Sequence, residues 1–451
     1  MTKISPYANI KRLNKIKLYM NKPSASHNNQ PVYIDELDPY FQEEAELGRE
    51  MLLDMTEDIE PGALLGSVYA MSRDQELPYS DNVLRLVEAS KAKVGMAGKR
   101  GSSKLINGHV GRYFKEKGIE INYSQRPVEA LLDLDPQDYI DFAAWHTEDL
   151  VEAESEFYLK LPGLINELVK SHKTLESMGK IPVLPEDIFN ARLKNIVVHA
   201  ADIFDDKMLS EGSPLLGYHS EEGPMSDIGI AVQLVRDPSD LKQAVFHEAG
   251  HYLSGKDHVK VPGVIAAGDT GFGIITTRTG LRQKTSGANG WINEAGNEHY
   301  TQMLLMASEY NRQAEQGVGD FLAEALGKYS LADEVYIPDF TGDDMRKTSH
   351  LGSYRLNRKA TGILIEPGQL AEMTSKALFH NARPSSRWPT KPVDDWLTGF
   401  NAHYGDQILP TADNYIRIKG IRDFSDELEE RHASKQPHWQ SLAEDLKRKS
   451  A

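Results

Sequence analysis

The chain contains no cysteine, so it has no disulfide framework, no thiolate metal site and no cysteine nucleophile. Basic residues are also scarce relative to acidic ones, with 51 lysines and arginines against 67 aspartates and glutamates and a formal net charge of −16. This balance argues against a nucleic-acid-binding protein. Any metal ion that the chain binds must be held by histidine and carboxylate side chains.

Long apolar segments are missing as well, because no run approaches the roughly 18 residues that read as a transmembrane helix. The basic N-terminus lacks the apolar segment of a secretory signal. We therefore expect a cytoplasmic protein without a transmembrane segment, while export without such a signal stays open. With 451 residues, 40% of them hydrophobic, the chain is long enough to bury two or three cores.

Residues 241–253 carry His247, Glu248 and His251 in the order H-E-x-x-H. On an α-helix, residues four positions apart lie above one another, so both imidazoles can hold one tetrahedral Zn²⁺ at roughly 2.0–2.1 Å. Glu248 would lie beside the ion, where it can take a proton from the metal-activated water and return it to a leaving group. Zinc is favoured because imidazoles suit a borderline-soft ion. The alternative is a charged helix with two ordinary histidines.

The flanking sequence favours a helix at this position. Residues 237–240 (Asp-Pro-Ser-Asp) offer an N-cap and a proline suited to the first helical turn. Leu241, Val245 and Ala249 recur at four-residue spacing, which predicts a buried stripe on a different face from the histidines.

The third zinc ligand has three candidates, which are His258, Asp257 and Glu294. His258 follows His251 by seven residues, one position later than in the pattern H-E-x-x-H-x-x-G-x-x-H, which has histidine where this chain has Asp257. Glu294 is the better candidate because it opens a second segment with helical apolar periodicity. Glu298 shares a face of that helix, so one carboxylate can bind the metal while the next orients a ligand histidine.

The motifs H-E-A-G-H at residues 247–251 and N-E-A-G-N-E at residues 293–298 together resemble the gluzincin metallopeptidases, which are thermolysin-like in the broad sense. The resemblance covers roughly residues 190 to 310 and implies a zincin-like core, in which a small sheet with an edge strand accompanies the two metal-binding helices. The longer gap between the motifs indicates an inserted hairpin. The resemblance implies zinc ligation by His247, His251 and Glu294, a base at Glu248, and orientation of a ligand by Glu298.

Each motif also contains a pair of small residues, Ala249–Gly250 in the first and Ala295–Gly296 in the second. Glycine inside a helix costs about 1 kcal/mol relative to alanine, so two such glycines require a reason. Small residues let two helices approach closely. We therefore expect the two helices to pack against each other at these pairs.

The chain divides into four expected regions: a basic flexible arm at 1–35, a helical region at 36–185, the catalytic core at 186–315 and a mainly helical region at 316–451. Strands are expected at residues 195–199, 228–235 and 271–280, with a turn at 286–290 and a peripheral helical tail at 423–449. In gluzincins, an edge strand before the H-E-x-x-H helix pairs with the substrate. Residues 228–235 are the candidate for that edge, and an interior strand is the alternative.

These features predict an α+β zinc metallopeptidase that acts on a peptide or protein substrate. Tyr354 is the first candidate for stabilising the oxyanion of the reaction, with Tyr300 and His350 as competitors. Two other functions stay open. One is a catalytically silent, zinc-stabilised interaction protein, and the other is an adaptor that binds an anionic surface through the basic arm. The sequence carries no signal for an oligomeric state.

Overall fold

The chain is described by a computed structural model. The described residues are 60–73, 81–98, 103–122, 124–205, 217–220, 226–253, 256–259, 264–270, 273–278, 284–288, 290–315, 336–337, 346–347, 352–364, 400, 402, 407–433 and 441–450. The predicted arm at 1–35 lies outside them. Two compact units are present, residues 1–149 with 204–210 and residues 150–203 with 211–451. The boundary expected near residue 185 falls inside the second unit, in the loop between two helices that end and begin at Ser177 and Glu186.

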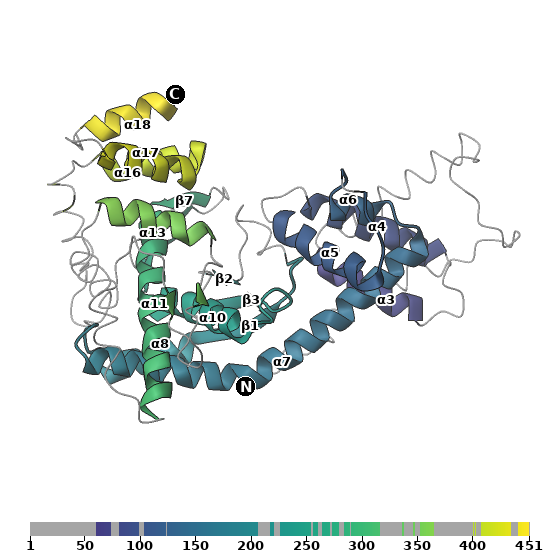
Figure 1. Cartoon of the computed structure of the whole chain (residues 1–451), viewed down its shortest axis with the longest axis horizontal. Helices are drawn as coiled ribbons and strands as arrows, with labels where there is room; N and C mark the ends of the chain where they lie inside the picture. The colour runs from purple at the N-terminus through teal and green to yellow at the C-terminus, as the bar shows by residue number, and fades with distance from the viewer. Residues whose placement is uncertain are drawn as a thin grey trace, which may run out of the picture. The chain divides into compact units, whose positions relative to one another are not determined.

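The secondary-structure elements in the described part of the first unit are all helices (Figure 1). Its elements are α3 (Pro61–Arg73), α4 (Asp81–Ala97), α5 (Ser103–Lys117), α6 (Pro127–Leu132) and the beginning of α7 (Pro136–Ser177). Apolar side chains such as Leu65, Val87 and Phe142 are fully buried between these helices. Arg112 forms an ion pair of 2.7 Å with Asp149, which also lies in this unit.

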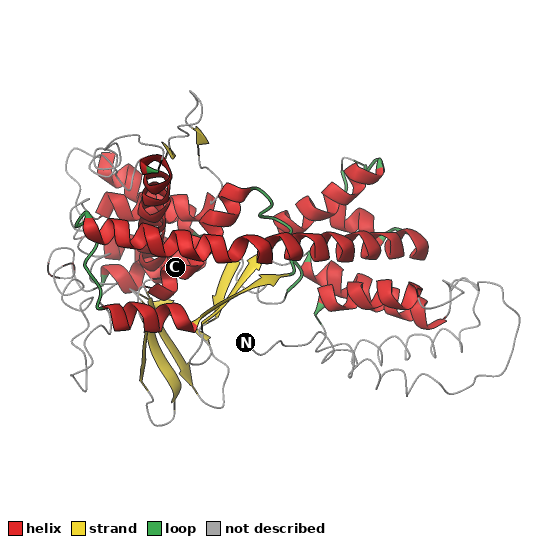
Figure 2. Cartoon of the chain, turned by 90° about the horizontal axis from the view of Figure 1, so that it is seen from below, coloured by secondary structure: helices red, strands yellow, loops and turns green. Residues whose placement is uncertain are grey.

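The second unit combines helices with small sheets, which fits the predicted α+β class (Figure 2). Besides the rest of α7, its helices are α8 (Glu186–Asn195), α10 (Pro238–Leu253), α11 (Gly290–Ala314), α13 (Gly352–Leu364), α16 (Ile408–Lys419), α17 (Ile421–Ala433) and α18 (Leu442–Ser450). Its strands are β1 (Ile196–Ala201), β2 (Gly217–Ser220), β3 (Ser226–Ala231), β4 (Lys256–Val259), β5 (Val264–Thr270), β6 (Gly273–Arg278), β7 (Lys284–Ala288), β8 (Tyr336–Ile337) and β9 (Arg346–Lys347). No helix in the described part of the chain is both long enough and apolar enough to cross a membrane.

Strand β3 lies in the middle of the sheet next to α10, with β1 parallel on one side and β2 antiparallel on the other. Gly229 pairs with His199 of β1 and with Tyr218 of β2. The candidate edge strand at 228–235 is therefore an interior strand, and it ends at Ala231 because a turn follows. Among the described residues the edges of this sheet are β1 and β2, and β2, which the sequence did not predict, is the edge that packs against α10.

An antiparallel sheet, in the order β4-β5-β6-β7, occupies the segment between α10 and α11. The strand predicted at 271–280 is present as β6. The turn predicted at 286–290 is wrong, since residues 286–288 belong to β7 and α11 begins at residue 290. The insertion between the two motifs is thus a four-stranded sheet and not a single hairpin.

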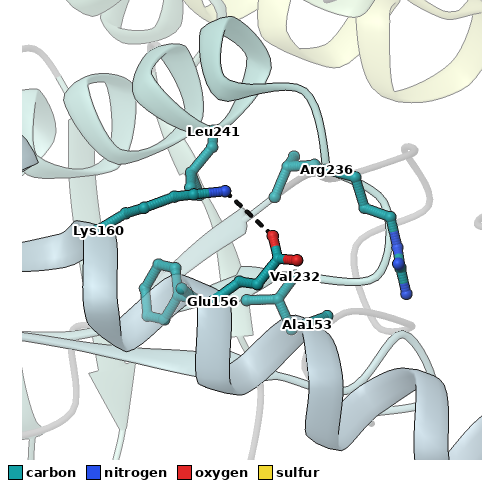
Figure 3. A pocket seen from close by; sticks show the side chains of 8 residues that line it. Ala153, Glu156, Lys160, Val232, Arg236 and Leu241 are labelled. Atoms are coloured by element: carbon teal, nitrogen blue, oxygen red, sulfur yellow. Dashed lines mark hydrogen bonds and ion pairs between the residues drawn. The ribbon is translucent and has the colours of Figure 1, made fainter.

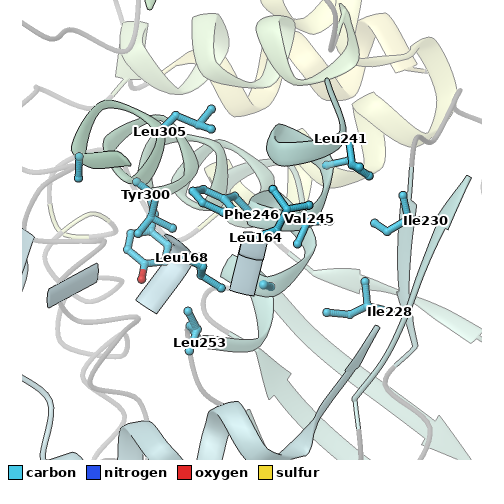
Figure 4. Close-up of a cluster of buried hydrophobic side chains, with 14 of the residues drawn as sticks. Leu164, Leu168, Ile228, Ile230, Leu241, Val245, Phe246, Leu253, Tyr300 and Leu305 are labelled. Atoms are coloured by element: carbon cyan, nitrogen blue, oxygen red, sulfur yellow. The ribbon is translucent and has the colours of Figure 1, made fainter. Parts of the chain in front are cut away.

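Helix α10 lies inside the main hydrophobic core of this unit (Figure 4). Its predicted stripe is confirmed, because Leu241, Val245 and Ala249 are all buried in that core. Phe246 and Leu253 are buried too, so the helix is covered on more than the predicted face. Burial on several faces explains why the histidines of this helix are shielded from water.

A second core contains the start of α11 and the C-terminal helices α13, α16, α17 and α18. The ring of Trp291 meets Phe424 edge to face at 5.2 Å, and Leu428 and Leu446 are fully buried. The peripheral tail expected at 423–449 is therefore wrong. These helices bury the end of α11 that carries the second motif.

Candidate metal centre

Helix α10 begins where the sequence places its cap. The backbone N–H of Ser239 donates to Asp237 Oδ1 at 2.8 Å, and the N–H of Leu241 donates to the Asp237 carbonyl at 3.0 Å. Pro238 occupies the first helical position, where its missing N–H is not needed. The cap fixes the start of the helix two and a half turns before its first histidine.

Three predicted ligand atoms converge between α10 and α11. The Nε2 atoms of His247 and His251 are 3.2 Å apart, and Glu294 Oε2 lies 3.3 Å from the first and 3.2 Å from the second. Ligands bound tetrahedrally at roughly 2.0–2.1 Å from zinc are spaced about 3.3–3.4 Å from one another. The donor triangle therefore has the size and the chemistry of three corners of a tetrahedral zinc site, and the three residues fit that ion.

The two histidine side chains are buried, whereas the Glu294 side chain is 29% exposed. Solvent can therefore reach the triangle from the side of Glu294. Among the described residues, these three alone form a group of histidine and acidic side chains that could hold a metal ion.

Glu298 lies behind His247, on the side away from the triangle. His247 Nδ1 is 3.0 Å from Glu298 Oε2, and because a carboxylate accepts, Nδ1 carries the hydrogen. An imidazole that keeps this hydrogen and loses the proton on Nε2 presents Nε2 to the triangle, which is the form that binds a metal. The structure thus places Glu298 in the position that the sequence predicted.

Opposing effects set the charges at this site. Burial disfavours the charged form of His247, but hydrogen bonds with Glu294 and Glu298 outweigh it and raise the pKa of the imidazole to about 10. Burial also opposes ionisation of Glu294, yet its interactions with His251 and His247 hold the pKa of this carboxyl well below its usual range. A metal ion would have to displace a proton from His247.

The helices α10 and α11 approach closely at Gly250. A Cβ atom at this position would lie 2.5 Å from Asn297 Oδ1 and 3.4 Å from the ring of Tyr300. Asn297 Nδ2 donates to the backbone carbonyl of His247 at 2.7 Å, so α11 contacts this ligand residue through its backbone as well. The close approach expected at the small pairs is confirmed at Gly250.

Glu248 is buried, and its carboxylate is not part of the group of ligand atoms. Its Cγ packs beside β2, where a Cβ on Gly217 would lie 3.0 Å from it. The side chain of Glu248 therefore lies beside β2.

The other predicted residues have different outcomes. The hydroxyl of Tyr300 lies 2.6 Å from His172 Nδ1 on α7, so Tyr300 belongs to the packing of α7 and α11 and is not placed to stabilise an oxyanion. Tyr354 lies on α13, which packs against α11, but its side chain is outside the described residues. The same holds for the side chains of Asp257 and His258 on β4, and for His350.

Two glutamines near Glu298 were missed by the sequence analysis. Gln302 Nε2 donates to Glu298 Oε1 at 2.6 Å, and Gln243 Nε2 lies 3.5 Å from the same atom. Helical spacing could have revealed both, since Gln243 precedes His247 by four residues and Gln302 follows Glu298 by four.

A separate hollow lies between α7 and the turn that leads from β3 into α10 (Figure 3). Glu156 and Lys160 line it and form an ion pair of 3.1 Å with each other. It contains none of the candidate ligands, so we assign no chemistry to it.

No known protein family, curated protein or solved structure matches the chain.

Proposed function

We propose that this protein is a zinc-dependent peptidase of the gluzincin type with a zincin-like core. The observation that carries the proposal is the donor triangle of His247, His251 and Glu294, whose edges of 3.2–3.3 Å match the spacing of zinc ligands. The hydrogen bond from His247 to Glu298 adds the outer contact that metal-binding histidines usually make.

A zinc ion held there would supply Lewis acidity, which activates a water molecule and polarises the carbonyl of the scissile peptide bond. Glu248 accepts the proton of that water as its oxygen bonds to the carbonyl carbon. The same carboxyl then donates the proton to the nitrogen as the carbon–nitrogen bond breaks. Glu298 holds the ring of His247 in its ligand orientation during both steps.

Strand β2 is the expected place for an extended peptide substrate. Among the described residues it lies at one edge of its sheet and packs against α10 beside Glu248. An edge strand can bind a peptide through main-chain hydrogen bonds, which tolerate many side chains. This role replaces the one that the sequence analysis gave to residues 228–235.

The first test is the zinc content of the purified protein. We expect about one zinc ion per chain in the wild type and in His258→Ala, and little in Glu294→Ala. His258→Ala serves as the control because His258 was a rival candidate for the third ligand. A wild type that is folded but binds no zinc would overturn the proposal.

The second test separates a peptidase from a zinc-stabilised protein without activity. Glu248→Gln keeps the size of the side chain and removes the base, so it should retain zinc and lose hydrolysis of a peptide library. Equal hydrolysis by Glu248→Gln and the wild type would refute the assigned mechanism. Zinc binding without any hydrolysis by the wild type would favour the silent alternative.

A further inference from the structure

A second layer of polar side chains surrounds the carboxylate of Glu298. Its Oε2 accepts from His247 Nδ1 at 3.0 Å, while its Oε1 accepts from Gln302 Nε2 at 2.6 Å. Gln243 Nε2 lies at 3.5 Å from the same Oε1, a longer and weaker contact. All of these side chains are at least 94% buried, so water contributes little to the arrangement.

The direction of these contacts follows from the chemistry of the groups. A carboxylate only accepts hydrogen bonds, so Gln302 must turn its nitrogen and not its oxygen toward Glu298. The Oε1 atom of Gln302 then has no hydrogen-bond partner among the described residues, although it is buried. The amide of Gln302 thus directs its nitrogen toward Glu298 and leaves its oxygen without a hydrogen bond among the described residues. This is unusual for a side chain that only fills space, because buried polar atoms are normally hydrogen-bonded.

The two glutamines come from different helices. Gln302 is one turn after Glu298 on α11, and Gln243 is one turn before His247 on α10. Together they limit rotation of the Glu298 side chain, because its Oε1 is held while its Oε2 faces His247. A change in the direction of Oε2 would turn the imidazole and move Nε2 away from the donor triangle.

We propose that Gln302, assisted by Gln243, is a positioning residue of the metal centre that acts through Glu298 and His247 on zinc affinity and ligand geometry. The inference rests on the zinc site of the proposed function. Residues that hold a metal ligand from outside typically change metal affinity 10- to 100-fold when they are replaced. Gln302 contacts Glu298 and not the ligand His247 itself, so we expect its replacement to change metal affinity by the lower end of that range.

The test compares two glutamine-to-methionine changes on the same helix. Gln302→Met keeps the length of the side chain and removes the donor. Gln313→Met is the matched control, because Gln313 is also buried and donates to a glutamate four residues earlier, Glu309, at 3.0 Å, but that glutamate contacts no candidate ligand. Zinc affinity is measured by competition with a chelator, and ligand geometry by the visible spectrum of the protein loaded with Co²⁺.

We expect Gln302→Met to weaken zinc binding about 10-fold and to shift the Co²⁺ spectrum, while Gln313→Met changes neither. If Gln302→Met does not fold by circular dichroism, Gln243→Met replaces it, with a smaller weakening in the same direction. Wild-type affinity and spectrum in the folded variant would overturn the inference and leave the zinc site intact. A wild type that binds no zinc would overturn both.

Discussion

Replacing Gly250 with alanine tests how closely helices α10 and α11 must approach. The added Cβ would lie 2.5 Å from Asn297 Oδ1, a distance that such atoms do not tolerate. Asn297 cannot simply rotate away, because it is buried and its Nδ2 donates to the carbonyl of His247. Relief of this contact moves the helices apart and breaks that hydrogen bond.

The magnitude follows from three effects. Alanine has the better helix propensity and contributes roughly 0.5–1 kcal/mol of stability. Overpacking a filled interior costs about 1–3 kcal/mol, and loss of the buried hydrogen bond costs about 1 kcal/mol more. The sum is a net destabilisation of roughly 1–3 kcal/mol for Gly250→Ala, with weaker zinc binding because the donor atoms on α10 and α11 separate.

The assay is denaturant unfolding with and without a chelator, together with zinc affinity. Gly163→Ala is the control, since Gly163 lies in α7 and a Cβ there would contact nothing within 4 Å. Without the clash, the control should gain up to about 1 kcal/mol from helix propensity. The change in unfolding free energy should therefore have opposite signs in the two variants. Equal stabilisation of both would refute the close packing of α10 on α11.

Three further outcomes follow from the structure. Gly217→Ala should lower peptide turnover roughly 10- to 100-fold while zinc content stays unchanged, because the new methyl group displaces Glu248; normal turnover would contradict the placement of the base. Since the pKa of His247 is raised to about 10, zinc binding should release about one proton near neutral pH and tighten about 10-fold per pH unit, as calorimetry in different buffers can show. Burial lowers the pKa of His172 to about 4, so the unfolded chain binds a proton between about pH 6.5 and 4 that the folded chain does not. Stability should fall over that window by at most roughly 3 kcal/mol, and His172→Gln should flatten the profile of unfolding free energy against pH.

Local patterns in the sequence predict the parts of the site that lie on one helix. The cap at Asp237, the stripe through Val245 and the four-residue spacing of the histidines depend only on helical periodicity, and the structure has them all. Glu294 and Glu298 were found by the same periodicity on a second helix. Convergence of the two helices was expected from the small pairs Ala249–Gly250 and Ala295–Gly296, and the structure shows the close approach at Gly250.

Long-range pairing explains the parts that were missed. The apolar run from Ile228 fits an interior strand as well as an edge strand, and its place depends on β2, whose four residues have no strong strand pattern. The segment 423–449 has one apolar face, which suits a peripheral helix or a packed one. Contact of Phe424 with Trp291 joins residues more than a hundred positions apart, so no local pattern could indicate it.

The geometry of the donor triangle favours a metal ion over a shared proton. His247 Nε2, His251 Nε2 and Glu294 Oε2 lie 3.2–3.3 Å apart, and once His247 has lost its proton on Nε2 all three can offer electron pairs to one ion. One proton can bridge only two of these atoms, whereas a zinc ion at about 2.0–2.1 Å can bond to all three. Helix α11 begins in one hydrophobic core, with Trp291, and continues into the other, with Tyr300. Because both cores fix the helix, the position of Glu294 is set by packing, which supports the cation site proposed for these three donors.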